Sequence, residues 1–501
     1  MKSYSLFFEA KRCQKNLVII QNKETFMSLA RIGIRGAYFT SLALAFRQVI
    51  SLSTTFYVAR QLLPADIGLF SLVMIVIGLA QVIGDMGIGT GVVRSQKNSP
   101  ILLSTCFWIG AGIGLTLSIV VFVLAPVAGW FYNKAEIEPF LKASAVGLLI
   151  NFLIPVPMAL LQQKLAYKEI AISQGIGSLL GAMMAIACVY SGLGIWGLVL
   201  QPIAGNIVIL LMLLAFSKWM PVFKFKYSSA QEIIHSGMHL LGAGVASYFR
   251  STFDSMVIGK ALPAGDLGIY GMAQTILYAP MHLITSTISR VIFPLLAKVQ
   301  GDVSKVKDAV LTATSRTALL IFPLYFGLFV LSDEFVLHVF GANWSSMSNL
   351  IRIMTISFLV QSIGNVAGPL MLALGKAKII FRISIAGVLF FFTMLLLVIP
   401  YGLTMVAISY ATTNAIIGIC SVGIALNYAK IPVASYIKAI AKPFALAAIM
   451  GLSIIILKIV LNSSDLLHFA IYVIAGICIY TTLVLFFEKH ACQQALQAVF
   501  K

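Results

Sequence analysis

The chain has 501 residues, of which 60% are hydrophobic and only 10% charged. So few polar side chains cannot cover the surface of a water-soluble protein, which excludes a soluble enzyme and predicts an integral membrane protein. We attribute the formal net charge of +19 to lysines and arginines that face anionic lipid, so no DNA or RNA partner is expected.

The first 26 residues have a cationic start and an apolar patch. They lack a clean hydrophobic stretch followed by small residues at a cleavage site, so they do not predict a signal peptide. Two alternatives remain: an interfacial helix, or a segment that precedes a native start at Met27. The resemblance described below favours the second.

Beyond this segment, apolar stretches of about 20 residues follow one another, each long enough to cross about 30 Å of hydrocarbon. They predict an all-α membrane protein with about fourteen transmembrane helices. The expected helices cover approximately residues 34–59, 67–92, 101–131, 139–160, 170–190, 195–216, 237–260, 267–296, 309–331, 347–373, 379–400, 404–427, 443–461 and 469–487. Pro155, Pro157, Pro280 and Pro294 should kink or end helices, since irregular backbone exposed to lipid is not tolerated.

An internal repeat marks the ends of the first and seventh helices. Residues 60–70 (RQLLPADIGLF) return as residues 260–270 (KALPAGDLGIY), with Asp66 and Gly68 matching Asp266 and Gly268. The repeated unit is therefore six helices, and an even number makes the two copies parallel. The last two helices lie outside the repeat. Duplicated membrane proteins are mostly transporters.

This repeat predicts the domain organisation. We expect an N-terminal extension at residues 1–26, an N-lobe of six helices at 27–217, a cytoplasmic linker at 218–236, a C-lobe of six helices at 237–427, and two further helices with a cytoplasmic tail at 428–501.

The distribution of lysine and arginine predicts the orientation. With the N-terminus in the cytoplasm, the inner segments hold about 25 of the 35 cations and the outer loops roughly five, among them Arg60, Lys260 and Lys458. Both termini are therefore expected on the cytoplasmic side.

Sequence motifs for chemistry are missing. There is no P-loop, no GxSxG, no HExxH and no dinucleotide fingerprint. His235 and His239 are four residues apart but have no third ligand nearby, so no metal site is expected, and the scattered cysteines indicate small core residues. No loop is long enough for a soluble catalytic domain. We therefore expect neither an enzyme nor a resident cofactor.

Two arginines lie at similar depth in the two copies: Arg47 in the first helix and Arg250 in the seventh. A guanidinium near the middle of the bilayer costs about 2.5–3.5 kcal/mol or more, so each should face a water-filled cavity or an acid. Arg47 shares a helical face with Ser51 and Thr54, and Arg250 shares one with Asp254. We expect the two faces to meet between the lobes.

Further polar residues extend these faces. The expected helix over residues 267–296 adds Gln274, Tyr278 and Thr285. Together with Ser51 and Thr54 these are candidate sugar contacts, while Arg290 and Arg316 extend the cationic surface. Static alternatives stay open: Arg250 and Asp254 as a neutral pair, Arg47 paired with Asp85, and the polar stripes as bonds between helices.

The charge balance favours an anionic ligand. Arginines in the spans, Arg352 included, outnumber the two acids Asp85 and Asp254. Because guanidinium groups match phosphate oxygens in a bidentate way, a phosphate or pyrophosphate head group is the expected ligand.

Three segments carry a family resemblance: residues 57–96, 253–274 and 289–302. They resemble the polysaccharide transporter family, lipid-linked oligosaccharide flippases of the multidrug, oligosaccharidyl-lipid and polysaccharide exporter superfamily, with most similarity to the colanic-acid and exopolysaccharide type. In that family an Asp at the position of Asp254 is common. The resemblance does not imply an Arg at the position of Arg250, so the case for Arg250 as a ligand rests on its depth and charge.

The resemblance implies two six-helix lobes around a cavity that opens alternately to the two sides of the bacterial inner membrane. It implies undecaprenyl-pyrophosphate-linked oligosaccharide repeat units as substrate, for O-antigen, colanic acid or capsule export. Membrane lipids, a polysaccharide polymerase and a chain-length regulator are the partners it implies.

Two other functions remain as alternatives. A drug or organic-cation antiporter shares the duplicated architecture but needs a dominant buried acid, and a membrane scaffold could keep a transport fold without transport. Asp85 and Asp254 are candidate sites for coupling to H⁺ or Na⁺ or for purely structural bonds, and the membrane potential acting on an anionic head group is another energy source.

Overall fold

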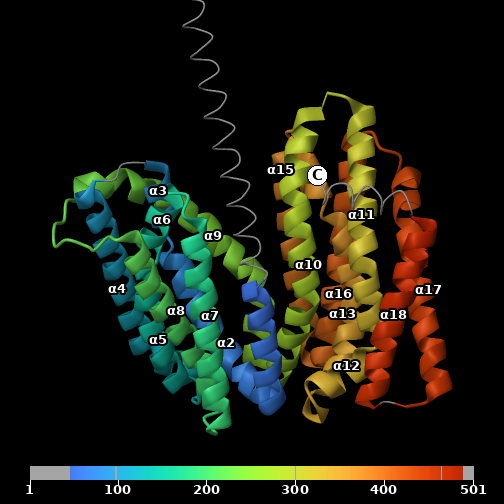
Figure 1. The fold of residues 1–501 in the computed structure, drawn as a ribbon, viewed down its shortest axis with the longest axis horizontal. Helices are drawn as coiled ribbons and strands as arrows, with labels where there is room; N and C mark the ends of the chain where they lie inside the picture. The colour runs from blue at the N-terminus through green and yellow to red at the C-terminus, as the bar shows by residue number, and fades with distance from the viewer. Residues whose placement is uncertain (1–45, 96–98, 300, 464, 489–501) are drawn as a thin grey trace, which may run out of the picture. The chain divides into compact units, whose positions relative to one another are not determined.

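The computed structural model describes residues 46–95, 99–299, 301–463 and 465–488. The predicted N-terminal extension, the start of the first helix and the end of the C-terminal tail lie outside the described residues. Within them the chain is helical, with no strand (Figure 1). The expectation of an all-α protein is confirmed.

Two compact units divide the described chain. Unit 1 comprises residues 46–55, 76–129 and 136–248, and unit 2 comprises residues 56–75, 130–135 and 249–488. A helix over residues 46–61, α2 (Pro64–Gly84) and α9 (Tyr227–Ala261) each contribute to both.

The remaining helices of unit 1 are α3 (Ile88–Ser95), α4 (Pro100–Tyr132, whose last turn is in unit 2), α5 (Ile137–Leu153), α6 (Pro155–Gln163), α7 (Tyr167–Tyr190) and α8 (Trp196–Ser217). Those of unit 2 are α10 (Ala264–Val299), α11 (Val303–Val330), α12 (Ser332–Val339), η1 (Ala342–Trp344), α13 (Met347–Gly364), α14 (Ala367–Ala373), α15 (Ala377–Val398), η2 (Ile399–Tyr401), α16 (Leu403–Tyr428), α17 (Val433–Leu461) and α18 (Leu466–Phe487).

Eleven helical segments of the described chain are long and apolar enough to cross a membrane. The fold is that of a multi-pass membrane protein, as predicted, whereas the number fourteen stays a prediction. Three expected spans, 67–92, 139–160 and 347–373, are each two consecutive helices. The short α12 and η1 were not predicted, because eight and three residues are too few for a periodic signal.

The repeated sequence packs against itself inside unit 2. A β-carbon on Gly68 would overlap the carbonyl oxygen of Ala264, and one on Gly268 would overlap that of Pro64. Gly68 and Gly268 are 200 positions apart, as are Pro64 and Ala264. The helices α2 and α10 therefore cross at equivalent glycines. Small residues let two backbones approach this closely, which explains why both copies have glycine here.

The cations of the repeat hold the neighbouring helix ends. Arg60 donates to the carbonyl of His338, and Lys260 donates to that of Phe131. The equivalent carbonyls of Ala59 and Gly259 accept from Trp344 Nε1 (3.0 Å) and Lys134 Nζ (3.0 Å). The repeat therefore also fixes the ends of its helices through side chains that satisfy terminal carbonyl groups.

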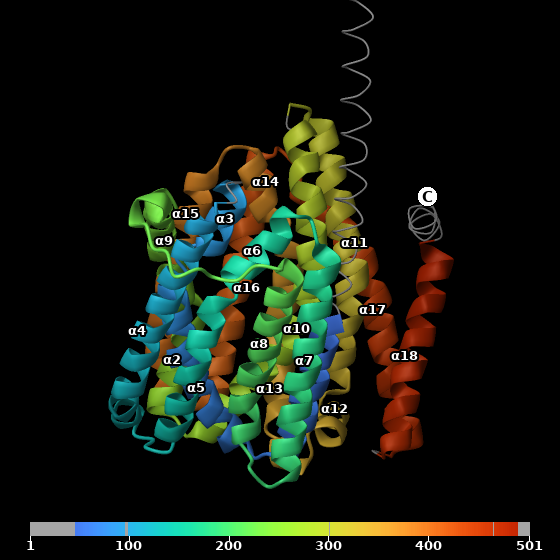
Figure 2. The same ribbon diagram turned by 60° about the vertical axis from the view of Figure 1, so that its left-hand side comes forward.

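The two helices outside the repeat, α17 and α18, lie at one edge of unit 2 beside α11 (Figures 1 and 2). A buried apolar cluster joins these two helices to α11. It includes Val330 of α11, Met450 and Ile454 of α17, and Tyr472 of α18.

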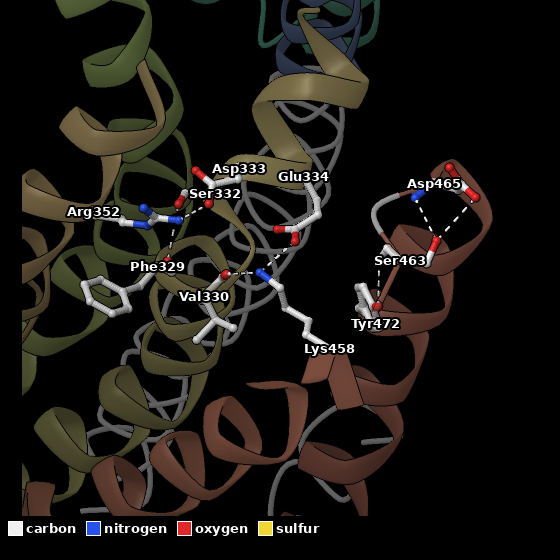
Figure 3. A network of polar contacts seen from close by, with 10 residues as sticks. All are labelled: Phe329, Val330, Ser332, Asp333, Glu334, Arg352, Lys458, Ser463, Asp465 and Tyr472. Carbon is white, nitrogen blue, oxygen red and sulfur yellow. Dashed lines mark hydrogen bonds and ion pairs between the residues drawn. The ribbon is translucent and has the colours of Figure 1, made fainter. Parts of the chain in front are cut away.

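A polar network completes this contact (Figure 3). Lys458 Nζ lies 2.7 Å from Glu334 Oε1 and donates to the Val330 carbonyl at 3.3 Å. Glu334 is only 5% exposed, so the pair is largely shielded from solvent. Nearby, Arg352 pairs with Asp333.

Candidate functional site

Two helices in corresponding positions of the repeats are broken. The first break is at Ile154, between α5 and α6, where Pro155 cannot donate a backbone hydrogen bond. The second is at Asn365 and Val366, between α13 and α14. Paired interruptions of this kind mark binding sites in duplicated transporters, and here each adjoins a cavity.

The larger cavity lies entirely within unit 2 and has a volume of about 650 Å³. This is within the range of about 300–1,000 Å³ typical of ligand sites. Six helices (α9, α10, α13, α14, α15 and α16) and the second break line it. The polar and aromatic lining residues are Arg250, Ser251, Asp254, Gln274, Tyr278, Asn365, Ser384, Phe391, Tyr410, Asn414 and Ser421.

Asp254 is the buried acid of this cavity, with 4% of its surface exposed. Its Oδ2 accepts hydrogen bonds from Tyr270 Oη (2.7 Å) and Gln274 Nε2 (3.1 Å), and its Oδ1 accepts from the Ser255 backbone N–H (2.8 Å). A carboxylate that accepts three hydrogen bonds is held in one orientation, and the bonds offset part of the cost of its burial.

Aromatic rings form one wall. The hydroxyl groups of Tyr278 and Tyr410 lie 2.7 Å apart and share a hydrogen bond. Phe391 meets Tyr410 edge-on at 5.9 Å between ring centroids, and Phe358 packs behind both tyrosines. This wall therefore presents ring surfaces and hydroxyl groups to the cavity.

Three buried polar atoms beside this wall have no hydrogen-bond partner in the described structure. They are Asn365 Nδ2, in the break after α13, and Ser409 Oγ and Thr413 Oγ1, both on α16. A buried polar group without a partner is costly, so bound water or a polar ligand is the expected complement. Asn365 also lines the cavity.

Arg250 lines the cavity and remains exposed. Among the described residues no ion pair joins it to Asp254, although the two lie one helical turn apart. Four predicted residues, Arg250, Asp254, Gln274 and Tyr278, are thus brought together.

The residues predicted on the first helix belong to unit 1. Arg47 and Ser51 are exposed, and Thr54 is buried and donates to the Ile50 carbonyl at 2.8 Å. Thr54 therefore bonds within its own helix. The predicted meeting of this face with that of Arg250 stays a prediction.

None of the other predicted arginines whose side chains are described lines the cavity with Arg250. Arg316 is exposed on α11 and is not a lining residue of the cavity. The side chains of Arg290 and Thr285 lie outside the described residues. Arg352, counted above among the excess cations, pairs with Asp333, so it adds no net charge to a cavity.

Asp85 lies in the gap between α2 and α3, where its Oδ1 accepts from the Gly87 N–H at 3.2 Å. It is exposed and lines the smaller cavity of about 360 Å³ beside the first break, together with Gln81 and Asn151. No described ion pair joins it to Arg47.

Sequence reasoning missed Asn365, Tyr410 and Asn414. Two signals were available: the run GNVAGP at residues 364–369, which interrupts a span, and polar residues four apart in the apolar helix α16. The first predicts a helix break, and the second places two polar side chains on one face.

Comparisons with known proteins agree with this architecture. Residues 57–349 match the family model described as "Polysaccharide biosynthesis protein". The lipopolysaccharide biosynthesis protein WzxC of Escherichia coli (strain K12) is 26% identical over 368 residues, which cover 72% of this chain and 73% of that protein. The teichuronic acid biosynthesis protein TuaB of Bacillus subtilis (strain 168) is 26% identical, covering 74% of this chain and 78% of the relative.

Solved structures with the same fold include the lipid II flippase MurJ in an inward closed conformation, with a TM-score of 0.70 and 18% identity over 90% of this chain and 99% of that one. A multidrug resistance MATE family transporter of the MOP superfamily, in an inward-facing conformation, has a TM-score of 0.58 and 14% identity over 77% of this chain and 94% of that one. Identities this low establish the fold alone.

Proposed function

Because this chain belongs to the polysaccharide biosynthesis protein family, we propose that it is a flippase for lipid-linked oligosaccharides. The proposed substrate is an oligosaccharide repeat unit on undecaprenyl pyrophosphate, moved across the bacterial inner membrane for surface polysaccharide export. The observation that carries the proposal is the 650 Å³ cavity of unit 2, where an arginine, a buried acid, amides and aromatic rings meet beside a helix break.

These groups suit the head of such a lipid. Sugars present many hydroxyl groups and apolar ring faces, which match hydrogen-bonding side chains such as Asn365 and aromatic rings such as Tyr410. The Arg250 guanidinium offers paired donors to phosphate oxygens. The lipid tail can remain in the bilayer, so only the polar head needs this environment.

For energy coupling we propose Asp254 as the site at which H⁺ or Na⁺ binding favours one conformation. Carboxylate and amide oxygens are suitable ligands for a hard cation, and Asp254 shares its cavity with Asn365 and Asn414. Coupling requires that the cation bind the two conformations with different affinity. Asp85, exposed at the other cavity, is the second candidate.

We further propose that the protein works beside a polysaccharide polymerase and a chain-length regulator, with both termini in the cytoplasm. The lysine and arginine distribution supports the orientation. The family supports the partners, because a unit carried across the membrane must then be polymerised.

A drug or organic-cation antiporter is the second candidate. The buried Asp254 and its tyrosine neighbours favour it, since an acid surrounded by aromatic rings attracts organic cations. Arg250 in the same cavity opposes it.

Deletion of the gene tests the proposal. We expect lipid-linked repeat units to accumulate inside the cell and a surface polysaccharide to be lost, with both restored by the wild-type gene. Unchanged glycans with new sensitivity to organic cations would contradict the flippase and support the antiporter.

Complementation with variants tests the cationic site. Arg47→Ala and Arg250→Ala should each reduce export while membrane insertion remains normal. Arg382→Ala is the matched control, because Arg382 is exposed on α15 but does not line the cavity. Normal export in both Arg47→Ala and Arg250→Ala would refute the cationic site.

A further inference from the structure

The segment between α8 and α9, residues 218–226, combines cationic and aromatic side chains that the proposed transport site does not use. Its sequence is KWMPVFKFK, with three lysines and no acid. We call these nine residues the strap. The strap has no helical structure and belongs wholly to unit 1.

The strap is fixed to the start of α4 by three hydrogen bonds. The Val222 N–H donates to Ser104 Oγ (3.0 Å), the Lys226 N–H donates to Thr105 Oγ1 (3.1 Å), and Trp108 Nε1 donates to the Val222 carbonyl (3.0 Å). Ser104 and Thr105 are fully buried. The strap is therefore held in one place and orientation on unit 1.

Three of its apolar side chains are largely exposed. Phe223 is 89% exposed, Met220 70% and Phe225 60%. Phe223 stacks on Trp108 with 4.8 Å between ring centroids, which leaves its outer face uncovered. An exposed apolar patch on a fixed segment marks a surface that contacts a membrane or another protein.

The position of the strap indicates that this apolar patch contacts the membrane interface. It follows directly on α8, a helix of 22 residues, which at 1.5 Å per residue is about 33 Å long and matches the hydrocarbon thickness. The strap therefore begins where α8 leaves the hydrocarbon. Aromatic side chains are enriched at this depth, where an apolar ring and a polar neighbour are both accommodated.

The lysines add a charge preference. Phe223 and Phe225 alternate with Lys224 and Lys226 in the sequence, so aromatic and cationic side chains adjoin along the strap. All three strap lysines are exposed. Lys164 adds a further exposed cation beside the strap, because its Nζ donates to the carbonyl of Ser217, the residue before the strap (3.2 Å).

We propose that the strap is a membrane-interface anchor that binds anionic phospholipid head groups in the leaflet at this end of the helices. The phenylalanines enter the boundary between head groups and acyl chains, and the lysines contact lipid phosphates. Each lysine near an anionic surface contributes about 1 kcal/mol, or about fivefold in affinity.

Lipid binding to the purified full chain tests this anchor. The protein is delipidated in detergent and titrated with phosphatidylglycerol or phosphatidylcholine, and bound lipid is counted by native mass spectrometry. We expect the wild type to prefer phosphatidylglycerol. Lys218→Gln/Lys224→Gln/Lys226→Gln should lose this preference, with about fivefold weaker binding per lysine removed.

The matched control is Lys376→Gln/Lys378→Gln/Lys430→Gln, which removes three exposed lysines of unit 2 and gives the same net charge. It should keep the wild-type preference. Equal losses in both triple variants, or wild-type binding in the strap variant, would overturn the proposal.

Amide hydrogen exchange on the wild type gives a test that needs no variant. In nanodiscs that contain phosphatidylglycerol, residues 218–226 should exchange more slowly than in phosphatidylcholine alone. Equal exchange in the two lipids would also overturn the proposal, because binding would then lie elsewhere or depend only on apolar contact.

Discussion

At the scale of single residues, the cavity of unit 2 is organised around Asp254. Its carboxylate accepts from Tyr270, Gln274 and the Ser255 backbone, and Tyr278 and Tyr410 bond to each other on the same wall. The acid is thus fixed by neighbours, whereas Arg250 is exposed at the cavity and available to a ligand.

We predict that Asp254→Asn lowers export about tenfold or more while leaving the protein folded. The amide keeps the shape but loses the charge, and hydrogen bonds to a charged group are worth about 1.5–3 kcal/mol. Tyr270→Phe removes one donor and keeps the charge, so its effect should be smaller. Quantification of surface polysaccharide in complemented deletion cells checks both. Equal effects would contradict a role for the charge.

The polar residues of α9 and α10 could be predicted from the sequence because a polar stripe at helical spacing stands out in an apolar chain. Arg250, Asp254, Gln274 and Tyr278 share the cavity for this reason. The contribution of Asn365 and Tyr410 could not be predicted as easily, since it depends on a helix break and on how α13 packs against α16.

The pairing of Arg352 likewise depends on the fold. Its partner Asp333 lies in the unpredicted helix α12, so a charge count over the predicted spans missed it.

At the scale of helices, the repeated signature has a structural reason. Gly68 and Gly268 form the crossing of α2 and α10, each against the backbone of the other copy. The helix ranges followed from the apolar stretches, but the sequence repeat alone did not reveal that its two copies pack on each other.

We predict that Gly68→Ala and Gly268→Ala each destabilise the protein by about 1–3 kcal/mol, because the new methyl group would overlap backbone atoms. Thermal unfolding in detergent measures this. Gly423→Ala is the matched control: no atom lies within 4 Å of the added carbon, so helix propensity should leave stability unchanged or raised by up to about 1 kcal/mol. Similar melting temperatures for all three variants would refute the crossing.

The pair formed by Lys458 and Glu334 should anchor α17 and α18 to α11 and α12 (Figure 3). We predict that Lys458→Met costs about 3 kcal/mol, since it leaves the charge of the buried Glu334 without a partner. Lys458→Met combined with Glu334→Gln should cost less than Lys458→Met alone. A double-mutant cycle by thermal unfolding measures the coupling, and strictly additive losses would show that the two side chains act independently.

At the scale of the whole molecule, the chain combines two compact units with helices that pass from one to the other. The larger cavity belongs to unit 2 and the smaller one to unit 1. The sequence predicted the duplication from the repeat of residues 60–70 and 260–270, and the membrane class from long apolar stretches. Which polar groups share a cavity depends on tertiary packing within each unit.

Transport by the purified protein tests the central claim most directly. The full chain is reconstituted into liposomes with an oligosaccharide linked to undecaprenyl pyrophosphate in the inner leaflet, and arrival of the glycan outside is measured by a lectin that cannot cross the membrane. We predict transfer by the wild type above protein-free liposomes, and slower transfer by Arg250→Ala and Asp254→Asn. No transfer by the wild type, together with uptake of an organic cation in the same liposomes, would contradict the account.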